Sequence, residues 1–434
     1  MAIGIGLIGL GTVGRGVAEI LLDPKGRHPL VAELELRQVA VRSLERSLPQ
    51  GLNKELLCSD AAAVVANPAV DLVVEVMGGL EPARSLILAA IAAGKAVVTA
   101  NKAVIARHGA EIAAAAAEKG VYVLMEAAVG GGIPILEPLK QSLGANRIER
   151  VSGIINGTTN YILSRMALEG ASYPEVLADA QALGYAEADP AADVEGGDAA
   201  DKIAIIAGLA YGGLVDRAAI PTEGINQLQI RDINYARELG FVVKLLAVAE
   251  RHSSDSDGTE VLDVRVHPTL VPLDHPLAGV NGVNNAILVE ADPVGRVMFY
   301  GPGAGSGPTA SAVVADILNI AAIQQVAGAK AGLDPLLAAG SWRSCRLVDS
   351  TITQHRNYVR FQTADKPGVI GHIGSCFGAE GVSLQSIVQF ESKNAGAEIV
   401  VITHVVQESN FQRALAMILL RPEVEAITCC LRTL

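Results

Sequence analysis

Apolar and polar positions along the first third of the chain switch repeatedly between the period of a strand and the period of a helix. Residues 2–8 form a short apolar run, residues 12–22 repeat their apolar positions as an amphipathic helix does, and residues 34–41 alternate as a strand. The alternation of strand and helix continues through strand 71–77, helix 81–94, strand 95–100, helix 103–119 and strand 121–127. Strands that alternate with helices at this spacing predict a parallel sheet covered by helices on both faces.

The pattern changes after the glycines at 130–132, where longer helical segments mix with alternating strands. The helical segments are 159–169 and 198–211, and the strands are 245–250 and 261–266. This mixture predicts a second domain of the α+β class. A glycine-rich turn and a long helix at 301–321 then predict a segment that returns to pack beside the first domain.

A third, smaller unit begins at Tyr358, after a connector of mixed character. Its segments follow the order strand, helix, strand, strand, helix, strand: 358–363, 365–381, 382–390, 397–406, 408–419 and 424–432. This order is typical of a ferredoxin-like domain. The predicted fold class is therefore α/β, with a Rossmann-type parallel-sheet domain, an α+β middle domain and a C-terminal ferredoxin-like domain. The predicted boundaries are 1–135 with the returning segment 305–330, 136–304, a connector at 331–356, and 357–434.

Composition limits both the residues available for the core and the kinds of molecule that the protein can bind. Half of the residues are hydrophobic but only 3% are aromatic, so the core must consist mainly of Ala, Val, Ile and Leu, as in buried parallel sheets. The net charge of −12 leaves no basic surface for a nucleic acid or an anionic membrane. No stretch stays apolar over the roughly 20 residues of a membrane span, and the glycine-rich start lacks the basic cluster of a signal peptide. The five cysteines lack metal-ligand or disulfide spacing, so we expect a cytoplasmic protein that acts on a small molecule.

A glycine fingerprint follows the first predicted strand. Gly9, Gly11 and Gly14 have the spacing G-x-G-x-x-G and open the helix at 12–22. Such glycines make a tight turn and let a pyrophosphate approach the N-terminus of the helix. The sequence therefore predicts a dinucleotide site, and an ordinary glycine turn is the alternative. The residues of this site are Gly9, Gly11, Thr12, Val13 and Gly14.

The end of the second strand lacks the acidic residue that would bind an adenosine ribose. Arg42 stands there instead. An arginine at this place can pair with a 2′-phosphate, so the sequence favours NADP without excluding NAD. A solvated surface arginine is the alternative interpretation.

Two lysines are candidates for chemistry. Lys102 directly follows the strand 95–100, at the carboxyl end where open α/β sheets collect ligands; the alternative is that Asn101 caps the next helix and Lys102 is merely exposed. Lys202 lies four residues after Asp198, so the two side chains share one face if a helix begins near Asp198. A lysine oriented by a carboxylate can deliver a proton to a carbonyl oxygen as hydride reaches the carbon.

The segment 184–202 concentrates acidic residues in a chain with only 18% charged residues. Within it, Glu187 and Asp193 are candidate acceptors for a substrate ammonium group. The alternative is a surface acidic loop followed by an ordinary ion pair within one helix, which contributes only a few tenths of a kcal/mol.

Five motifs resemble those of homoserine dehydrogenases: GLIGLGTVGRGV, VVTANKAVIA, EAAVGGGIPIL, SGIINGTTNYIL and GYAEADPAADVEGGDAADKIAI. The resemblance covers essentially the whole chain, and together the motifs are highly specific. It implies the NAD(P)-dependent interconversion of L-aspartate 4-semialdehyde and L-homoserine, in threonine, methionine and isoleucine biosynthesis. No aspartate kinase region precedes the dinucleotide-binding part, so the resemblance is to the monofunctional form.

The resemblance also implies roles for individual residues. Lys202 would be the proton donor, Asp198 would orient it and contact substrate, and Lys102 would lie between cofactor and substrate. The residues implied in substrate binding are Glu187, Asp193, Tyr185, Gly184 and Thr158. Gly303 would approach the cofactor, and the segment 156–160 would bind substrate and help form the subunit contact of a homodimer or homotetramer.

The same resemblance implies a monovalent cation, most commonly sodium, beside the glycines at 130–132. Its implied ligands are Glu126, Val129, Gly131 and Ile133. Backbone carbonyls and a carboxylate suit a hard cation. The residues taken alone indicate only a hinge between domains.

The C-terminal unit resembles an ACT domain, a fold that pairs and binds amino acids. Residues 365–369 form its expected strand-to-helix turn, and residues 381–383 precede the next strand. The implied effector residues are Asp365, Gly368 and Val382, and threonine is the effector that suits the pathway. The alternative is a domain retained only for dimerisation, because likeness of fold does not establish a site.

Two other classes of function stay open. Another Rossmann oxidoreductase with an ACT domain, such as a hydroxy-acid dehydrogenase, needs a histidine paired with a carboxylate, and the middle domain has no histidine near a suitable acidic motif. A non-catalytic amino-acid sensor would not need Lys102, Asp198 and Lys202 together.

Overall fold

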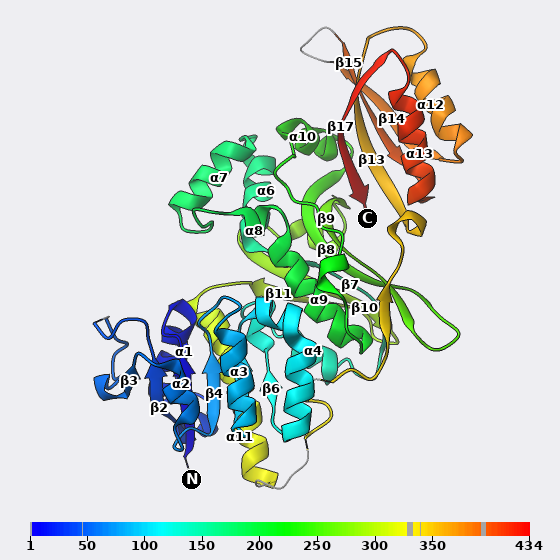
Figure 1. The fold of residues 1–434 in the computed structure, drawn as a ribbon. Helices are drawn as coiled ribbons and strands as arrows, with labels where there is room; N and C mark the ends of the chain where they lie inside the picture. The colour runs from blue at the N-terminus through cyan, green and yellow to red at the C-terminus, as the bar shows by residue number, and fades with distance from the viewer. Residues whose placement is uncertain (1, 46, 328–332, 339, 392–395) are drawn as a thin grey trace.

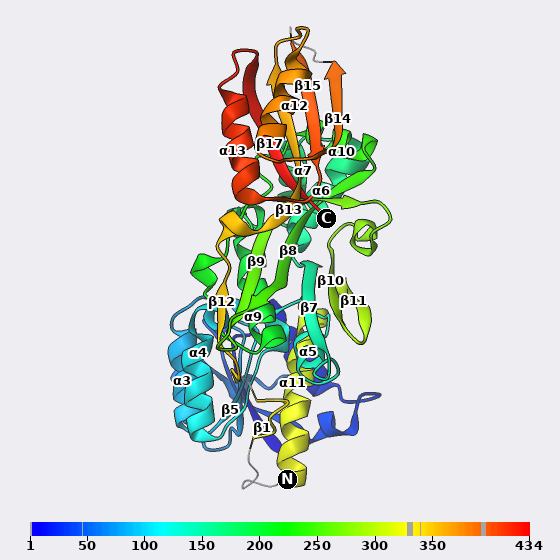
Figure 2. The same cartoon turned by 90° about the vertical axis from the view of Figure 1, so that its right-hand side faces the viewer.

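The chain forms three parts that follow one another along the long direction of the molecule (Figure 1). The computed structural model describes residues 2–45, 47–327, 333–338, 340–391 and 396–434. Positions 328–330 of the predicted returning segment, and positions 331, 332 and 339 of the predicted connector, lie outside the described residues. The N-terminal and C-terminal parts lie at opposite ends in both views, with the middle part between them (Figure 2).

The N-terminal part is a six-stranded parallel sheet covered by helices, as the alternating pattern predicts. Its strand order is β3-β2-β1-β4-β5-β6, and every neighbouring pair is parallel. The strands are β1 Ile3–Ile8, β2 Leu34–Ala40, β3 Leu57–Cys58, β4 Leu72–Glu75, β5 Ala96–Thr99 and β6 Val123–Leu124. The helices are α1 Thr12–Leu22, α2 Ala61–Ala66, α3 Ala83–Ala92 and α4 Lys102–Lys119. The central strands β1, β4 and β5 are buried from end to end, which explains their nearly unbroken apolar sequence.

Helix α11, Ser306–Ala327, returns from the middle part and packs against α1. Gly16 permits this approach, because a Cβ there would lie 2.7 Å from the carbonyl oxygen of Ser306. By length and composition, Ser306–Val326 could cross a membrane, so the expectation that no stretch is this apolar is wrong. Half of that segment is buried inside the chain, in a core shared with the parallel sheet, and this burial accounts for its apolar character.

The middle part is built on an antiparallel sheet against which helices α6, α9 and α10 pack. Its strands are β7 Arg147–Ile154, β8 Phe241–Ser254, β9 Glu260–Pro272, β10 Asn284–Asp292 and β11 Gly295–Pro302. Its helices are α5 Leu136–Lys140, α6 Gly157–Glu169, α7 Tyr173–Ala182, α8 Ala191–Val194, α9 Gly197–Tyr211 and α10 Ile230–Glu238. The sequence pattern does not predict β7, β10 or β11. Charged residues interrupt β7, and β11 is an edge strand with little buried surface.

The C-terminal part has the predicted ferredoxin-like order, which confirms the fold class. Its strands are β13 Gln354–Thr363, β14 Leu384–Glu391, β15 Ala397–Thr403 and β17 Val424–Thr433, and its helices are α12 Val369–Ala379 and α13 Glu408–Leu419. Two short strands add to the pattern: β12, Cys345–Leu347, pairs with β9, and β16, Val406–Gln407, pairs with β13. The strand predicted at 397–406 therefore divides into β15 and β16.

One sheet runs through both the middle and the C-terminal parts. Its order is β11-β10-β7-β8-β9-β17-β13-β15-β14. The joint is short, since β17 pairs with β9 only through Arg432 with Thr269 and Thr433 with Leu270. The sequence pattern does not predict this joint, because periodicity carries no information on which distant strands become neighbours.

Buried charged side chains reinforce this joint. Arg360 of β13 donates from Nε to Asp232 of α10 at 2.7 Å and from Nη1 to Glu398 of β15 at 3.0 Å. Each of these three side chains is at most 2% exposed. Glu398 also accepts hydrogen bonds from Arg231 and Tyr235 of α10. Opposite charges at hydrogen-bonding distance thus offset the cost of removing these groups from water.

Candidate active site

The turn between β1 and α1 is shaped to receive a phosphate group. Gly9 has a φ of 102°, in the left-handed region that favours glycine. A Cβ on Gly14 would lie 2.0 Å from the carbonyl oxygen of Gly9, whereas a Cβ on Gly11 would meet nothing within 4 Å. The backbone N–H groups of Gly11, Thr12 and Val13 donate to no acceptor among the described residues. These groups at the start of α1 therefore remain available to a pyrophosphate.

Arg42 and Gly303, the other two expected cofactor contacts, come from separate segments of the chain. Arg42 is exposed just after β2, which neighbours β1 in the sheet. Gly303 lies between the N-terminal and middle parts: a Cβ on Gly131 would lie 2.4 Å from the backbone of Gly303, and a Cβ on Gly303 would lie 2.0 Å from Nδ2 of Asn285. Only glycine fits this close approach of two chain segments.

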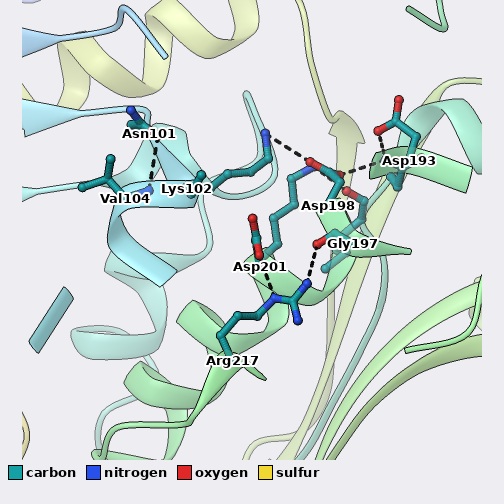
Figure 3. Close-up of polar contacts among 12 residues, drawn as sticks. Asn101, Lys102, Val104, Asp193, Gly197, Asp198, Asp201 and Arg217 are labelled. Carbon is teal, nitrogen blue, oxygen red and sulfur yellow. Dashed lines mark hydrogen bonds and ion pairs between the residues drawn. The ribbon is translucent and has the colours of Figure 1, made fainter. Parts of the chain in front are cut away.

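Asp198 lies at the centre of a polar cluster between the N-terminal and middle parts (Figure 3). Its Oδ2 accepts hydrogen bonds from Nζ of Lys202 at 2.7 Å and from Nδ2 of Asn156 at 2.8 Å. Its Oδ1 lies 3.1 Å from Nζ of Lys102. The Asp198 side chain is only 8% exposed. One buried carboxylate therefore binds two lysines, and each lysine comes from a different part of the chain.

The two lysines determine the charge of this carboxylate. Burial alone would raise the pKa of Asp198, but the positive charges of Lys202 and Lys102 outweigh burial and hold this pKa well below its usual range. Burial alone would likewise lower the pKa of Lys102, and the charge of Asp198 raises it above its usual value instead. Asp198 is therefore ionised and Lys102 is protonated near neutral pH.

Lys102 is positioned by the start of α4. Asn101 caps this helix, with Oδ1 accepting from the backbone N–H of Val104 at 3.3 Å. Lys102 is the first residue of the helix, and its side chain is 38% exposed. Both interpretations of this segment are thus partly right, since Asn101 is a cap and Lys102 nevertheless reaches Asp198.

Lys202 is positioned by the start of α9. The helix begins at Gly197, so Asp198 and Lys202 lie one turn apart on one face, as their spacing predicts. The Lys202 side chain is 12% exposed, and its Nζ also donates to the carbonyl oxygen of Ile155 at 2.8 Å. The ammonium is therefore fixed by two acceptors from two segments.

Asn156 joins this cluster to the acidic segment. Its Nδ2 donates to Oδ1 of Asp193 at 2.7 Å as well as to Asp198. Burial raises the pKa of Asp193, and the hydrogen bond from Asn156 opposes this effect. Thr158, two residues further along, donates from Oγ1 to the carbonyl oxygen of Tyr185 at 2.7 Å. The start of α6 thus lies between Asp198 and the segment that follows α7.

Glu187 and Gly184 are not connected to this cluster. Both residues are exposed in the loop after α7, and the Glu187 side chain makes no hydrogen bond or ion pair with another described residue. Tyr185 is 45% exposed, and its ring centroid lies 4.9 Å from that of Tyr161. The structure therefore brings Asp193 to Asp198 and leaves Glu187 on an open loop.

The carboxylate of Glu126 acts as a helix cap. It accepts backbone N–H bonds from Ile135, Leu136 and Glu137, at distances between 2.5 and 2.9 Å. Burial raises the pKa of Glu126, and these three hydrogen bonds oppose that effect. Both carboxylate oxygens thus accept backbone N–H groups, and the backbone carbonyl of Glu126 accepts the N–H of Val129 at 3.3 Å.

Three other carbonyl groups lie in the segment that follows Glu126. Val129, Gly131 and Ile133 are buried, and their carbonyl oxygens accept no hydrogen bond from the described residues. An unpaired buried carbonyl is costly, so the segment fits a cation bound through its backbone. In the part of the chain that the structure describes, no group of three or more His, Cys, Asp or Glu side chains could hold a metal ion.

The expected effector residues lie at two places in the C-terminal part. Asp365 and Gly368 form an exposed turn before α12, where Gly368 has a φ of 91°. Val382 precedes β14 and is only 4% exposed, within the core of the domain. The turn is therefore open to a ligand, whereas the side chain of Val382 is not.

Sequence reasoning missed some contacts of the cluster. The carbonyl of Ile155 binds Lys202, and a main-chain acceptor has no signature in a sequence. Arg107 of α4 lies 3.0 Å from Asp201 of α9, beside the lysine cluster. The signal for this pair is weak: a lone arginine in an alanine-rich helix and one more acid in an acidic segment.

Family models match three consecutive regions of the chain. The model described as "Homoserine dehydrogenase, NAD binding domain" matches residues 9–126, and the model described as "Homoserine dehydrogenase" matches residues 134–318. The model described as "ACT domain" matches residues 357–416. The three regions lie in the three parts of the structure, in the predicted order.

Relatives that match the full length confirm the resemblance. The homoserine dehydrogenase of Synechocystis sp. is 56% identical over 436 residues, which cover 100% of both chains. A solved homoserine dehydrogenase from Thiobacillus denitrificans is 40% identical, with a TM-score of 0.90 over 100% of this chain and 98% of that one. A hyperthermophilic archaeal homoserine dehydrogenase in complex with NADPH is 28% identical, with a TM-score of 0.62 over 74% of this chain and 98% of that one. With the lysine cluster and the phosphate-binding turn in place, the chain belongs to the homoserine dehydrogenase family.

Proposed function

We propose that this homoserine dehydrogenase uses Lys202 as the proton donor to the carbonyl oxygen of L-aspartate 4-semialdehyde. The observation that carries the proposal is the 2.7 Å hydrogen bond between Nζ of Lys202 and Oδ2 of Asp198. A protonated lysine has three N–H groups, and two of them are engaged by Asp198 and Ile155. One N–H remains for a substrate oxygen. Asp198 stays ionised, so it orients the lysine and does not compete as a proton donor.

The two lysines share the stabilisation of the transition state. When bound, the reduced nicotinamide cofactor supplies the hydride that reaches the aldehyde carbon. As negative charge develops on the carbonyl oxygen, the ammonium groups of Lys202 and Lys102 stabilise it, and Lys202 transfers its proton to it. In the direction of homoserine oxidation, Lys202 accepts the hydroxyl proton. The contacts of both lysines with Asp198 support this division of roles.

Asp193 is the proposed acceptor for the substrate ammonium group, with Glu187, Tyr185, Gly184 and Thr158 completing the substrate site. The hydrogen bonds of Asn156 to Asp193 and Asp198 support this role, since they hold a carboxylate beside the reacting groups. Thr158 is tied to the backbone of Tyr185, so the exposed loop can contribute Glu187 from the other side.

Kinetics of L-homoserine oxidation test these roles. In Lys202→Ala, kcat should fall about 100-fold or more, the scale of general acid–base catalysis, whereas Asp193→Asn should chiefly raise the KM for L-homoserine. The exposed lysine variant Lys119→Ala, at the far end of α4, should retain full activity. A folded Lys202→Ala protein with undiminished kcat would refute the proposed proton donor.

NADP is the proposed cofactor, with NAD as a weaker alternative. The exposed Arg42 supports this preference, because a guanidinium can bind the 2′-phosphate in a bidentate way. The NADPH bound to the archaeal relative supports it as well. The phosphate-binding residues are Gly9, Gly11, Thr12, Val13 and Gly14, with Lys102 and Gly303 near the nicotinamide end.

In Arg42→Ala, kcat/KM for NADP should fall about tenfold, the loss expected for one charge-assisted hydrogen bond, while kcat/KM for NAD stays nearly unchanged. Steady-state rates with each cofactor measure this. An equal loss of kcat/KM with both cofactors would show that Arg42 does not bind the 2′-phosphate.

A monovalent cation, sodium by preference, is proposed at Glu126 and at the carbonyl oxygens of Val129, Gly131 and Ile133. The three unpaired buried carbonyls support it. A ligand that binds only the folded state raises the unfolding temperature. Sodium chloride should therefore raise the Tm above its value in tetramethylammonium chloride at equal ionic strength, and identical Tm values would contradict the site.

Feedback inhibition by L-threonine through the ACT domain is the proposed regulation. The open turn at Asp365 and Gly368 supports it, and Val382 would contribute through its backbone. L-threonine should inhibit homoserine oxidation, and Asp365→Ala should raise the inhibitory concentration, whereas Asp257→Ala, in an exposed turn of the middle part, should not. Activity that L-threonine leaves unchanged would indicate a domain that is structural or specific for another ligand.

A cytoplasmic homodimer or homotetramer is the proposed assembly. The edge strand β11 supports it, because its unpaired side and the half-exposed Met298 and Tyr300 suit pairing with a second copy. The segment 156–160 is largely buried within its own chain, so its contribution to a subunit contact would be indirect. Light scattering measures the assembly, and a monomer at assay concentrations would contradict it.

A further inference from the structure

A second ion pair links the N-terminal and middle parts beside the lysine cluster. Nη1 of Arg107 lies 3.0 Å from Oδ2 of Asp201. Lys102 and Arg107 both lie in the N-terminal half of α4, and Asp198 and Asp201 both lie near the start of α9. The same two helices are therefore joined twice, and only the pair between Lys102 and Asp198 belongs to the reacting groups.

Asp201 is a buried carboxylate that pairs with two arginines, and the two arginines differ in their exposure to solvent. It is 6% exposed, and Arg217 donates to it from Nε at 2.6 Å. Arg217 also donates from Nη2 to the carbonyl oxygen of Gly197 at 3.1 Å, which ties it to the start of α9 (Figure 3). Arg217 belongs to the middle part, as Asp201 does, and its side chain is 19% exposed, whereas that of Arg107 is 41% exposed. Arg107 is thus the partner that solvent can replace.

The two helices are less tightly packed beyond this contact. A cavity of about 1020 Å³ is lined by Gly109 and Ala113 of α4 and by Gly208 and Leu209 of α9. Arg107 and Arg217 line the same cavity, so it extends from the ion pair along the later turns of both helices. The contact that sets the distance between α4 and α9 is therefore concentrated near Lys102 and Arg107.

We propose that Arg107 and Asp201 form a latch that docks α4 on α9 and so places the ammonium of Lys102 beside Asp198 and Lys202. Both are positioning residues, since they bind each other and not the reacting groups. The inference rests on the role proposed above for Lys102. Without the latch, the pair of Lys102 with Asp198 is the one polar side-chain contact left between α4 and α9 among the described residues, and the Lys102 side chain is 38% exposed.

The first test is a comparison of Arg107→Ala with the conservative Arg107→Lys. Arg107→Ala leaves Asp201 paired with Arg217, so no buried carboxylate loses all of its partners. The Tm of this variant should therefore lie within about 2 °C of the parent's Tm. Its kcat at saturating L-homoserine and NADP should fall about tenfold, the scale of a charge-assisted hydrogen bond with one buried partner. Arg107→Lys should recover most of this loss. Because the pair is partly exposed, added salt should lower the parent's kcat toward that of Arg107→Ala.

The matched control is Arg84→Ala. Arg84 of α3 pairs with the exposed Glu111 of α4, and both residues belong to the N-terminal part. This variant removes an arginine ion pair from α4 without touching the contact with α9. Its kcat and its salt dependence should equal those of the parent.

The decisive measurement repeats Arg107→Ala in a Lys102→Ala background. If the latch acts by placing Lys102, the tenfold effect should nearly vanish there, because coupled residues are not additive. The same tenfold loss in both backgrounds, or an undiminished kcat in Arg107→Ala alone, would overturn the latch. Undiminished kcat in Lys102→Ala alone would instead refute the role proposed for Lys102, and the latch with it.

Discussion

The candidate active site of this protein depends on one buried carboxylate that is shared between two lysines. Asp198 stands at the start of α9, Lys202 follows it one turn later, and Lys102 reaches it from α4 in the other domain. A buried carboxylate in this position is stable only because positive charges lie within hydrogen-bonding distance. The site is therefore complete only when the two domains are docked. The returning helix α11, packed on α1, keeps them from separating widely.

The two junctions of the molecule handle charge differently. At the joint with the C-terminal domain, Arg360, Asp232 and Glu398 are buried almost completely and satisfy one another. At the joint between dinucleotide-binding and middle domains, the acids are buried but Lys102 and Arg107 are partly exposed. Removing a partner from the first group would strand a buried charge, which typically costs about 3–5 kcal/mol. The second group can open to water at far smaller cost. The ion pairs that are open to solvent therefore lie at the junction between the dinucleotide-binding and middle domains.

The local parts of this structure follow from the sequence, and the long-range parts do not. Strand and helix alternation predicted the parallel sheet, whose central strands β1, β4 and β5 are buried along their whole length. The four-residue spacing predicted the contact of Asp198 with Lys202, since a helix alone produces it. The pairing of β17 with β9 and the contacts of Arg360 with α10 connect positions far apart in the chain, and no periodicity encodes them. The sequence pattern predicted a helix that returns to the first domain, but not the segment that it meets there: α11 packs on α1, and Ser306 donates a hydrogen bond to the carbonyl oxygen of Thr12 across a separation of 294 positions.

The central position of β17 also bears on how the molecule is made. During synthesis the chain emerges from its N-terminus, so β9 and β13 leave the ribosome before the strand that lies between them. Until β17 follows, each of these strands presents an unpaired edge, and an unpaired edge is a template for pairing with another chain. Nearly all of β13 is buried in the finished fold, on both faces of the sheet. Before the sheet closes, this strand therefore exposes apolar side chains as well as an unpaired edge. The nascent protein therefore passes through a stage in which it is most prone to aggregate shortly before its sheet is closed.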